Sequence, residues 1–318
     1  MRWALAVVAL AALTVPSAAG AHLRTSRDAV DYRASARPSD APLRIRIYRA
    51  DLALGLTLLG AHRVIVLGYL GEPFLRLEPK GVFVNAASPT AAGAKLVRPH
   101  PSSPQPVWQL RSHRHSVVWH DARVRGLPRS VTHGSWRIPV LVDGRRTDLE
   151  GTIERVGAPP AWPWLVVGAV FAGALAFVLR RRTLIRPATV WLGSLGAAAA
   201  LLSAVGFATA STASQGAWIE GANEAVVALV AAVFLVRGSS STRALAGGFL
   251  GLLGLAVGLT KLPVFLHGIV LSALPGELAR LSVAIAIGAG AAAAILGLVV
   301  FFDVLEHYEE PELPTSAA

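Results

Sequence analysis

Histidines are the residues of this 318-residue chain whose type and grouping could do chemistry. The candidate ligands for copper or another metal ion are His22, His113, His115, His120 and His267. His120 is followed by Asp121, and metal sites often use a carboxylate to orient a ligating histidine. Imidazole without thiolate suits Cu(II), Ni(II) or Zn(II). The alternative is a set of scattered surface histidines, because no two-histidine spacing here matches a known ligand motif.

Motifs of the common enzyme classes are missing from the sequence. There is no Cys, which excludes disulfides, Cys-ligated zinc, iron–sulfur clusters and thiol nucleophiles. Ser, His and Asp occur without a Gly-x-Ser-x-Gly elbow, an HExxH helix or a glycine-rich phosphate loop. We therefore expect a non-enzymatic protein without a resident cofactor, with copper as the one metal candidate.

Composition places at least part of the chain in lipid. Hydrophobic residues make up 53% of the sequence and charged residues 15%, with a mean hydropathy of +0.53. The net charge is +11, and most of it falls in residues 22–160, which hold 21 Lys and Arg against 11 Asp and Glu. Such a surface could attract anionic cell-wall polymers or lipid headgroups, or be merely solvated. Nucleic acid is not expected, since neither a basic helix nor an aromatic platform is visible.

Residues 1–21 have the layout of a secretory signal peptide. Arg2 precedes an apolar run over residues 3–15, and small residues follow up to Ala21, where we expect cleavage. An uncleaved N-terminal anchor is the alternative, but the run is shorter than the ~20 residues that a spanning helix needs. In either case the residues after Ala21 are predicted to lie outside the cytoplasm.

Residues 22–160 are predicted to form an extracytoplasmic β-sandwich of immunoglobulin-like kind. Residues 43–48 alternate strictly between aliphatic residues and polar or aromatic ones, which is typical of a strand with one buried face. Further strands are expected at residues 63–69, 74–77, 81–85, 116–120, 135–142 and 147–153. About seven short strands separated by turn residues favour the sandwich.

Three connections between these strands can be assigned from their residues. Glu78-Pro79-Lys80 is expected to close one hairpin, and Asp143-Gly144 is a typical two-residue hairpin turn. Residues 98–106 contain four prolines and are therefore predicted to be a surface loop, because proline has no amide to donate to a ladder.

Residues 161–302 are predicted to form a five-helix transmembrane bundle. The five expected spans are residues 162–179, 188–208, 218–236, 244–260 and 281–302. If the first runs inward, the two inner loops carry six arginines, while the outer loop 211–221 carries no Lys or Arg. The positive-inside rule thus agrees with the signal peptide. We expect a multi-pass protein of the cytoplasmic membrane with the N-terminal domain outside.

The remaining segments complete this topology. Five spans place the acidic tail, residues 303–318, inside. Residues 262–278 contain Pro263 and Pro275 and are predicted to be an interfacial or re-entrant outer segment; a sixth span would move the C-terminus outside. A transporter is disfavoured because ionisable residues are nearly absent from the spans. A water-filled cavity lined by Glu224 and His267 would be the sign of one.

Several motifs resemble those of a family of actinobacterial membrane proteins that has no established activity. The family is similar in a GY-x-GEPYLR strand, a GVF-x-N hairpin, an SP turn and a WHD stretch before a Pro/Trp-rich joint. The matching segments here are Gly68–Arg76, Gly81–Asn85, Ser88-Pro89, Trp119–Asp121 and Pro159–Trp164. The likeness covers roughly residues 31–280 and implies an outer β domain followed by several spans.

The resemblance also suggests residues that hold the outer domain together: Gly71, Glu72, Pro73, Arg76, Asn85, Trp119 and Asp121. Glu72 would cap local amides, and Trp119 would fill the core. The family has further histidines after its WHD motif, whereas Ala122 follows Asp121 here. If those histidines bind metal, this chain has lost ligands, and His113 and His115 would have to replace them.

Two functions therefore remain open after the sequence. The first is a non-enzymatic envelope protein whose outer β domain binds a ligand, a partner protein or a cell-wall polymer while the helices anchor it in membrane lipid. The second is extracytoplasmic handling of copper or another metal ion through the five histidines.

Overall fold

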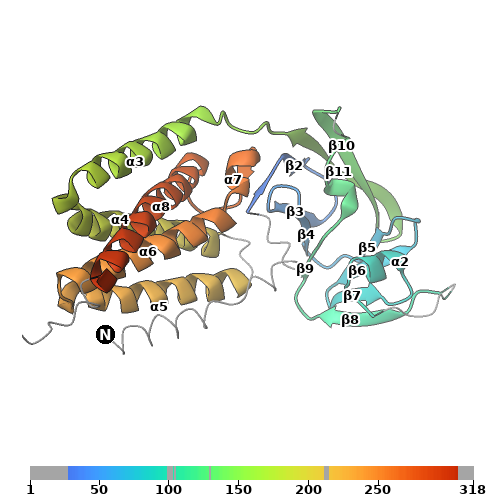
Figure 1. Cartoon of the computed structure of the whole chain (residues 1–318). Helices are drawn as coiled ribbons and strands as arrows, with labels where there is room; N and C mark the ends of the chain where they lie inside the picture. The colour runs from blue at the N-terminus through green and yellow to red at the C-terminus, as the bar shows by residue number, and fades with distance from the viewer. Residues whose placement is uncertain (1–27, 99–102, 104, 129, 211–214, 307–318) are drawn as a thin grey trace, which may run out of the picture. The chain divides into compact units, whose positions relative to one another are not determined.

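A computed structural model describes residues 28–98, 103, 105–128, 130–210 and 215–306 (Figure 1). The chain divides into two compact units, each with its own internal contacts. The β unit comprises Val30–Ala158 together with His267–Ile269. The helical unit comprises the rest of the chain, chiefly Pro159–Leu266 and the residues from Val270 onward. The predicted signal peptide, residues 1–21, lies outside the described residues.

Two antiparallel sheets build the β unit. The larger sheet has the strand order β2 (Tyr32–Ala36), β11 (Arg145–Arg155), β10 (His133–Val142), β5 (Val64–Leu67), β6 (Pro73–Glu78), β7 (Gly81–Asn85) and β8 (Trp108–Ser112). The smaller sheet has the order β3 (Leu43–Tyr48), β4 (Ala53–Leu58) and β9 (Ser116–Trp119). Two very short strands, β1 (Ala29–Val30) and β12 (Ile269–Val270), form a separate ladder.

Both sheets bury their inner faces in one hydrophobic core. Leu54 and Trp119 of the smaller sheet belong to the same cluster as Phe74 and Ile138 of the larger sheet. The rings of Phe74 and Trp119 meet edge to face, with centroids 5.8 Å apart. The predicted β-sheet region is therefore present, while its immunoglobulin-like type stays a prediction.

Alternation of residue types located β3 correctly. Leu43 is buried and Arg44 and Arg46 are exposed, as the pattern predicts. The strand predicted at residues 63–69 corresponds to β5, which ends earlier, at Leu67, because the chain turns there. Five strands lie in segments where no strand was predicted: β2, β4, β8 and the two very short strands β1 and β12.

Both predicted hairpins are confirmed. Glu78 pairs with Gly81 across the turn between β6 and β7. Val142 pairs with Arg145 across Asp143 and Gly144, whose φ angles are +50° and +86°. Two consecutive positive φ angles are the signature of the type I′ turn that suits a two-residue hairpin. The proline-rich stretch, residues 98–106, lies mostly outside the described residues.

Five long helices make up most of the helical unit: α3 (Trp162–Arg180), α4 (Ile185–Ala208), α5 (Gln215–Arg237), α6 (Ser240–Thr260) and α8 (Gly276–Glu306). Four of them, α3, α4, α6 and α8, are long and apolar enough to cross a membrane. α5 forms the expected helix but is not among these candidates, so the fifth span stays a prediction. α8 continues four residues beyond residue 302, the predicted end of the last span.

The shorter helices lie in the connections. They are α2 (Pro89–Gly93), α7 (Pro263–Leu266) and the 3-10 turns η2 (Ala122–Val124) and η3 (Arg182–Leu184). The predicted outer segment, residues 262–278, thus contains the single turn α7 and the short strand β12. Arg280 in the first turns of α8 is buried, and its Nε donates to the carbonyl of Val264 at 2.9 Å.

Glycines bring the backbones of α4, α6 and α8 into direct contact. A Cβ at Gly193 of α4 would overlap the carbonyl of Gly247 of α6, and a Cβ at Gly248 would lie 2.7 Å from the Cα of Gly297 in α8. Helices in lipid gain their stability largely from such close packing, since apolar side chains are equally well solvated by lipid. The glycines are therefore structural at these crossings.

Gly193→Ala is expected to destabilise the helical unit by about 2 kcal/mol, because the added methyl group cannot fit against the Gly247 backbone. Gly168→Ala is the matched control, since nothing lies within 4 Å of a Cβ at that position of α3. Thermal unfolding of the whole protein in detergent measures both. Equal melting temperatures for the two variants would contradict the close packing.

Candidate functional site

A tight turn between β5 and β6 projects from the β unit and has every backbone amide bonded. The turn comprises residues 68–71. The amide of Gly68 donates to the carbonyl of Glu72 at 2.7 Å, and the amide of Gly71 donates to the carbonyl of Gly68 at 3.2 Å. The amide of Tyr69 donates to Thr90 Oγ1 at 2.9 Å, and that of Leu70 to Glu72 Oε2 at 3.1 Å. Four consecutive amides are thus satisfied within the protein, which fixes the turn's conformation.

The two glycines of the turn are needed for different reasons. Gly71 has a φ of +79°, in the left-handed region where a side chain is strained. A Cβ at Gly68 would overlap the carboxylate of Glu72 and the hydroxyl oxygen of Thr90. One glycine therefore supplies backbone freedom, and the other leaves room for the polar contacts beneath the turn.

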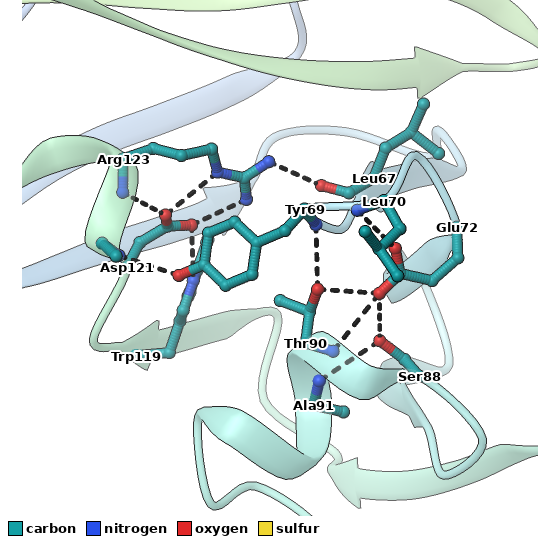
Figure 2. A network of polar contacts seen from close by, with 11 residues as sticks. Leu67, Tyr69, Leu70, Glu72, Ser88, Thr90, Ala91, Trp119, Asp121 and Arg123 are labelled. Carbon is teal, nitrogen blue, oxygen red and sulfur yellow. Dashed lines mark hydrogen bonds and ion pairs between the residues drawn. The ribbon is translucent and has the colours of Figure 1, made fainter.

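The carboxylate of Glu72 joins this turn to the start of α2 (Figure 2). Its Oε1 accepts hydrogen bonds from Ser88 Oγ at 2.8 Å, from Thr90 Oγ1 at 2.7 Å and from the Thr90 amide at 3.3 Å. Burial raises the pKa of the Glu72 carboxyl, but the bonds from the Thr90 and Ser88 hydroxyls lower it by more, so that it lies below its ordinary value of 4.5. Glu72 is therefore ionised at neutral pH.

Asn85 fixes the strand that follows the turn. Its side-chain amide donates to the carbonyl of Pro73, the first residue of β6, at 2.7 Å. Its Oδ1 accepts from the amides of Ala87 at 3.1 Å and of Val107 at 2.8 Å. Since Asn85 is 4% exposed, these three bonds satisfy a buried side chain and tie three segments together.

Asp121 forms a second polar centre beside the turn. Its side chain is fully buried and accepts from Trp119 Nε1 at 3.0 Å, from the Arg123 amide at 2.9 Å and from Arg123 Nη2 at 2.7 Å. It also caps the 3-10 turn η2. A buried carboxylate with this many charged and neutral donors is held in one position.

Arg123 connects Asp121 to the turn (Figure 2). Its Nη1 donates to the carbonyl of Leu67 at 2.9 Å, and its guanidinium lies 4.9 Å from the centroid of the Tyr69 ring. The hydroxyl of Tyr69 accepts from the amide of Ala122 at 2.8 Å. Burial raises the pKa of this phenol above its ordinary value of 10, so the hydroxyl stays neutral. The turn is thereby held from both sides.

The surface that this framework presents to solvent is largely apolar. Leu70 is 79% exposed and Tyr69 is 48% exposed, whereas Ser88, Thr90 and Asp121 are buried. The hydroxyls of Ser88 and Thr90 donate to Glu72, so they belong to the framework that holds the turn.

Most of the residues singled out from the resemblance meet at this site: Gly71, Glu72, Pro73, Asn85, Trp119 and Asp121. Arg76 does not take part, because its guanidinium lies over the rings of Phe83 and Trp108 and pairs with Glu78 at 3.5 Å.

Sequence reasoning missed Thr90 and Arg123, which contact the turn directly. One signal was available: Ser88-Pro89 is the typical start of a helix, with a capping hydroxyl followed by proline. Nothing in the sequence indicates that the helix start lies against Glu72.

The histidines of the 113–120 stretch occupy separate environments. His113 and His115 lie in the bend between β8 and β9, and His115 Nε2 is 3.0 Å from the carbonyl oxygen of Pro79. His120 lies directly after β9, with its Nδ1 2.6 Å from the carbonyl oxygen of Leu52. The imidazoles of His115 and His120 thus each face a backbone carbonyl.

The two remaining candidate ligands lie elsewhere. His267 Nδ1 is 3.0 Å from Asp31 Oδ2, and His22 lies outside the described residues. In the part of the chain that the structure describes, no three His, Cys, Asp or Glu side chains are grouped as metal ligands. The metal site stays a prediction.

Asp121→Asn is expected to lower the free energy of unfolding by roughly 3 kcal/mol, because Arg123 would lose the partner of a mostly buried charge. Asp143→Asn is the control, since its ion pair with His62 is exposed and should contribute little to stability. Thermal unfolding followed by near-ultraviolet circular dichroism reports both. A loss at Asp121 no larger than at Asp143 would contradict the role of the buried pair.

The lowered pKa of Glu72 predicts a pH-dependent contribution to stability. A carboxyl whose pKa is lower in the folded state stabilises fully above its unfolded pKa of about 4.5, and this contribution is lost as the pH falls through the folded value. The difference in melting temperature between the native protein and Glu72→Gln should therefore be largest at neutral pH and should shrink as the pH falls below about 4.5. A difference that is independent of pH would refute the prediction.

Comparison of the chain with protein families, with curated proteins and with solved structures gives no match.

Proposed function

We propose that the chain is a multi-pass protein of the cytoplasmic membrane whose β unit lies outside the cell and binds a partner protein through the Tyr69–Leu70 turn. The helices serve as its anchor in membrane lipid. The observation that carries the proposal is the exposed side chain of Leu70 on a turn whose four amides are all bonded within the protein.

Membrane placement draws support from the helices and from the charge of the loops. α3, α4, α6 and α8 have the length and hydropathy of spans, and we take α5 as the fifth. Arg180, Arg181, Arg182 and Arg186 follow the first span, which favours a cytoplasmic location for that loop. The N-terminal signal layout favours the same orientation, with residues after the fifth span inside.

A rigid turn with an exposed leucine has the properties of a binding anchor. Exposing an aliphatic side chain to water is unfavourable, and here 79% of Leu70 is exposed without any requirement of the fold. Tyr69 precedes Leu70 in the turn and Arg123 lies over the Tyr69 ring, and Tyr and Arg are enriched among residues that dominate protein interfaces. Because the turn is already ordered, binding does not have to order it. We infer a partner with an apolar pocket that takes Leu70.

The test places a photo-crosslinking amino acid at position 70 of the whole protein in its native membrane. We expect a discrete protein adduct from position 70 and none from position 59, since Leu59 is also exposed (42%) but lies beyond the end of β4. The adduct's mass and sequence identify the partner.

Affinity for that partner is then compared between two matched variants. Leu70→Glu should weaken binding by roughly 30-fold, the effect of losing an interface anchor, while Leu59→Glu should leave it unchanged. Both variants should keep the native melting temperature, because both side chains are exposed. Unchanged affinity in Leu70→Glu would refute the proposal.

A further inference from the structure

Positive charge is segregated in two segments of the β unit. Residues 41–50 and 79–120 contain no Asp or Glu at all. Together they hold eight basic residues: Arg44, Arg46, Arg49, Lys80, Lys95, Arg98, Arg111 and Arg114. The first segment contains β3 of the smaller sheet, which carries Arg44 and Arg46, and the second contains β9 of the same sheet.

Carboxylates neutralise arginines on the larger sheet instead. Glu150 and Glu154 of β11 pair with Arg37 and Arg33, and Glu78 of β6 pairs with Arg63. In contrast, Arg44 and Arg46 on β3 are exposed and have no ion-pair partner among the described residues. The charge of these two side chains is therefore available to an external anion.

Strand register places Arg44 and Arg46 on the outward face of the smaller sheet. Arg44 lies opposite Thr57 of β4, and Thr57 lies opposite Ser116 of β9. Both arginines point away from the core because they alternate with inward-facing aliphatic residues of β3. Side chains two residues apart on a strand are about 6.6–6.8 Å apart at their origins.

The centre of this face is lined by small and aromatic groups. Arg46 lies opposite Gly55, which in turn lies opposite Val118. A Cβ at Gly55 would overlap the ring of Tyr48, so the ring lies over the glycine, next to the half-exposed Val118. The face thus combines two guanidinium groups with an aromatic ring and carries no carboxylate. We name it the basic face: Arg44, Arg46, Tyr48, Gly55, Thr57 and Val118.

We propose that the basic face binds an anionic envelope polymer with repeating phosphodiester groups. Arginine is suited to phosphate because its planar guanidinium donates two parallel hydrogen bonds to two phosphate oxygens. Arg44 and Arg46 provide two such donors in series along β3, so that they contact successive anionic groups of one chain. The ring of Tyr48 provides an apolar surface for the carbon chain between the phosphates.

A polymer fits this face better than a bilayer surface does. Surfaces that insert into lipid combine cations with Trp, Phe or Leu side chains. The basic face has Val118 as its exposed aliphatic residue and contains no Trp, Phe or Leu. This proposal is independent of the Tyr69–Leu70 turn, which belongs to the connection between β5 and β6.

The absence of cysteine allows a clean test on the whole protein in a neutral detergent. An environment-sensitive fluorophore is attached to Val118→Cys, and synthetic poly(glycerol phosphate) is titrated, with neutral dextran as the control polymer. We expect a saturable fluorescence change with poly(glycerol phosphate) only. Raising the salt concentration should weaken the binding, because the interaction depends on exposed charges.

Matched charge variants locate the binding. Arg44→Gln/Arg46→Gln should lower the affinity by roughly 30-fold, as expected when two phosphate contacts of exposed arginines are lost. Arg145→Gln/Arg146→Gln removes the same net charge at the exposed β10–β11 hairpin and should change the affinity less than about twofold. Leu70→Glu should bind the polymer normally, which separates a failure of this proposal from a failure of the partner proposal.

Three results would overturn the proposal. The first is no saturable response to poly(glycerol phosphate). The second is an equal loss in the two arginine variants, which would show non-specific attraction to net charge. The third is a response in lipid discs that contain phosphatidylglycerol, with none to the soluble polymer, which would assign the face to lipid headgroups.

Discussion

The Glu72 carboxylate is the group on which the exposed turn depends. It accepts the amide of Leu70 within the turn and, at its other oxygen, the hydroxyls of Ser88 and Thr90 at the start of α2. Without it, these donors would be left unsatisfied in a partly buried place, and each such group costs about 1–3 kcal/mol. Asp121 acts on the opposite side of the turn through Arg123, which it holds in place and which donates to the carbonyl of Leu67. Two carboxylates therefore convert a short surface connection into a rigid element.

Strands were predictable where side chains alternate and turns carry their own signals. Residues 43–48 and the hairpin at Asp143 and Gly144 are of this kind. β4 also alternates, as Ala-Leu-Gly-Leu-Thr-Leu, but it was not predicted, because Ala and Gly are poor strand formers and weaken the signal. Its glycine is required by the Tyr48 ring, which lies over it from the neighbouring strand. β2 is likewise rich in small residues, so packing against β11, and not local preference, makes it a strand.

The candidate site was predictable in its motifs but not in its contacts. Glu72 and Asp121 attract attention as polar residues in unusual surroundings, yet their partners are fixed by the fold. Thr90 is 18 residues from Glu72, and Arg123 is 56 residues from the Leu67 carbonyl that it contacts. Such separations leave no periodic signal in a single sequence. Apolar runs located the helices better, since each of the five predicted spans lies on a long helix of the structure.

The turn is held by its backbone and by its neighbours, and the side chain at its tip takes no part. Leu70 contributes an amide to the framework, and any residue except proline supplies the same amide. A change of this one residue therefore leaves the scaffold intact while it alters the shape and polarity offered to other molecules. If the turn binds a partner as proposed, single substitutions at position 70 change what is recognised, with no compensating change in the rest of the domain.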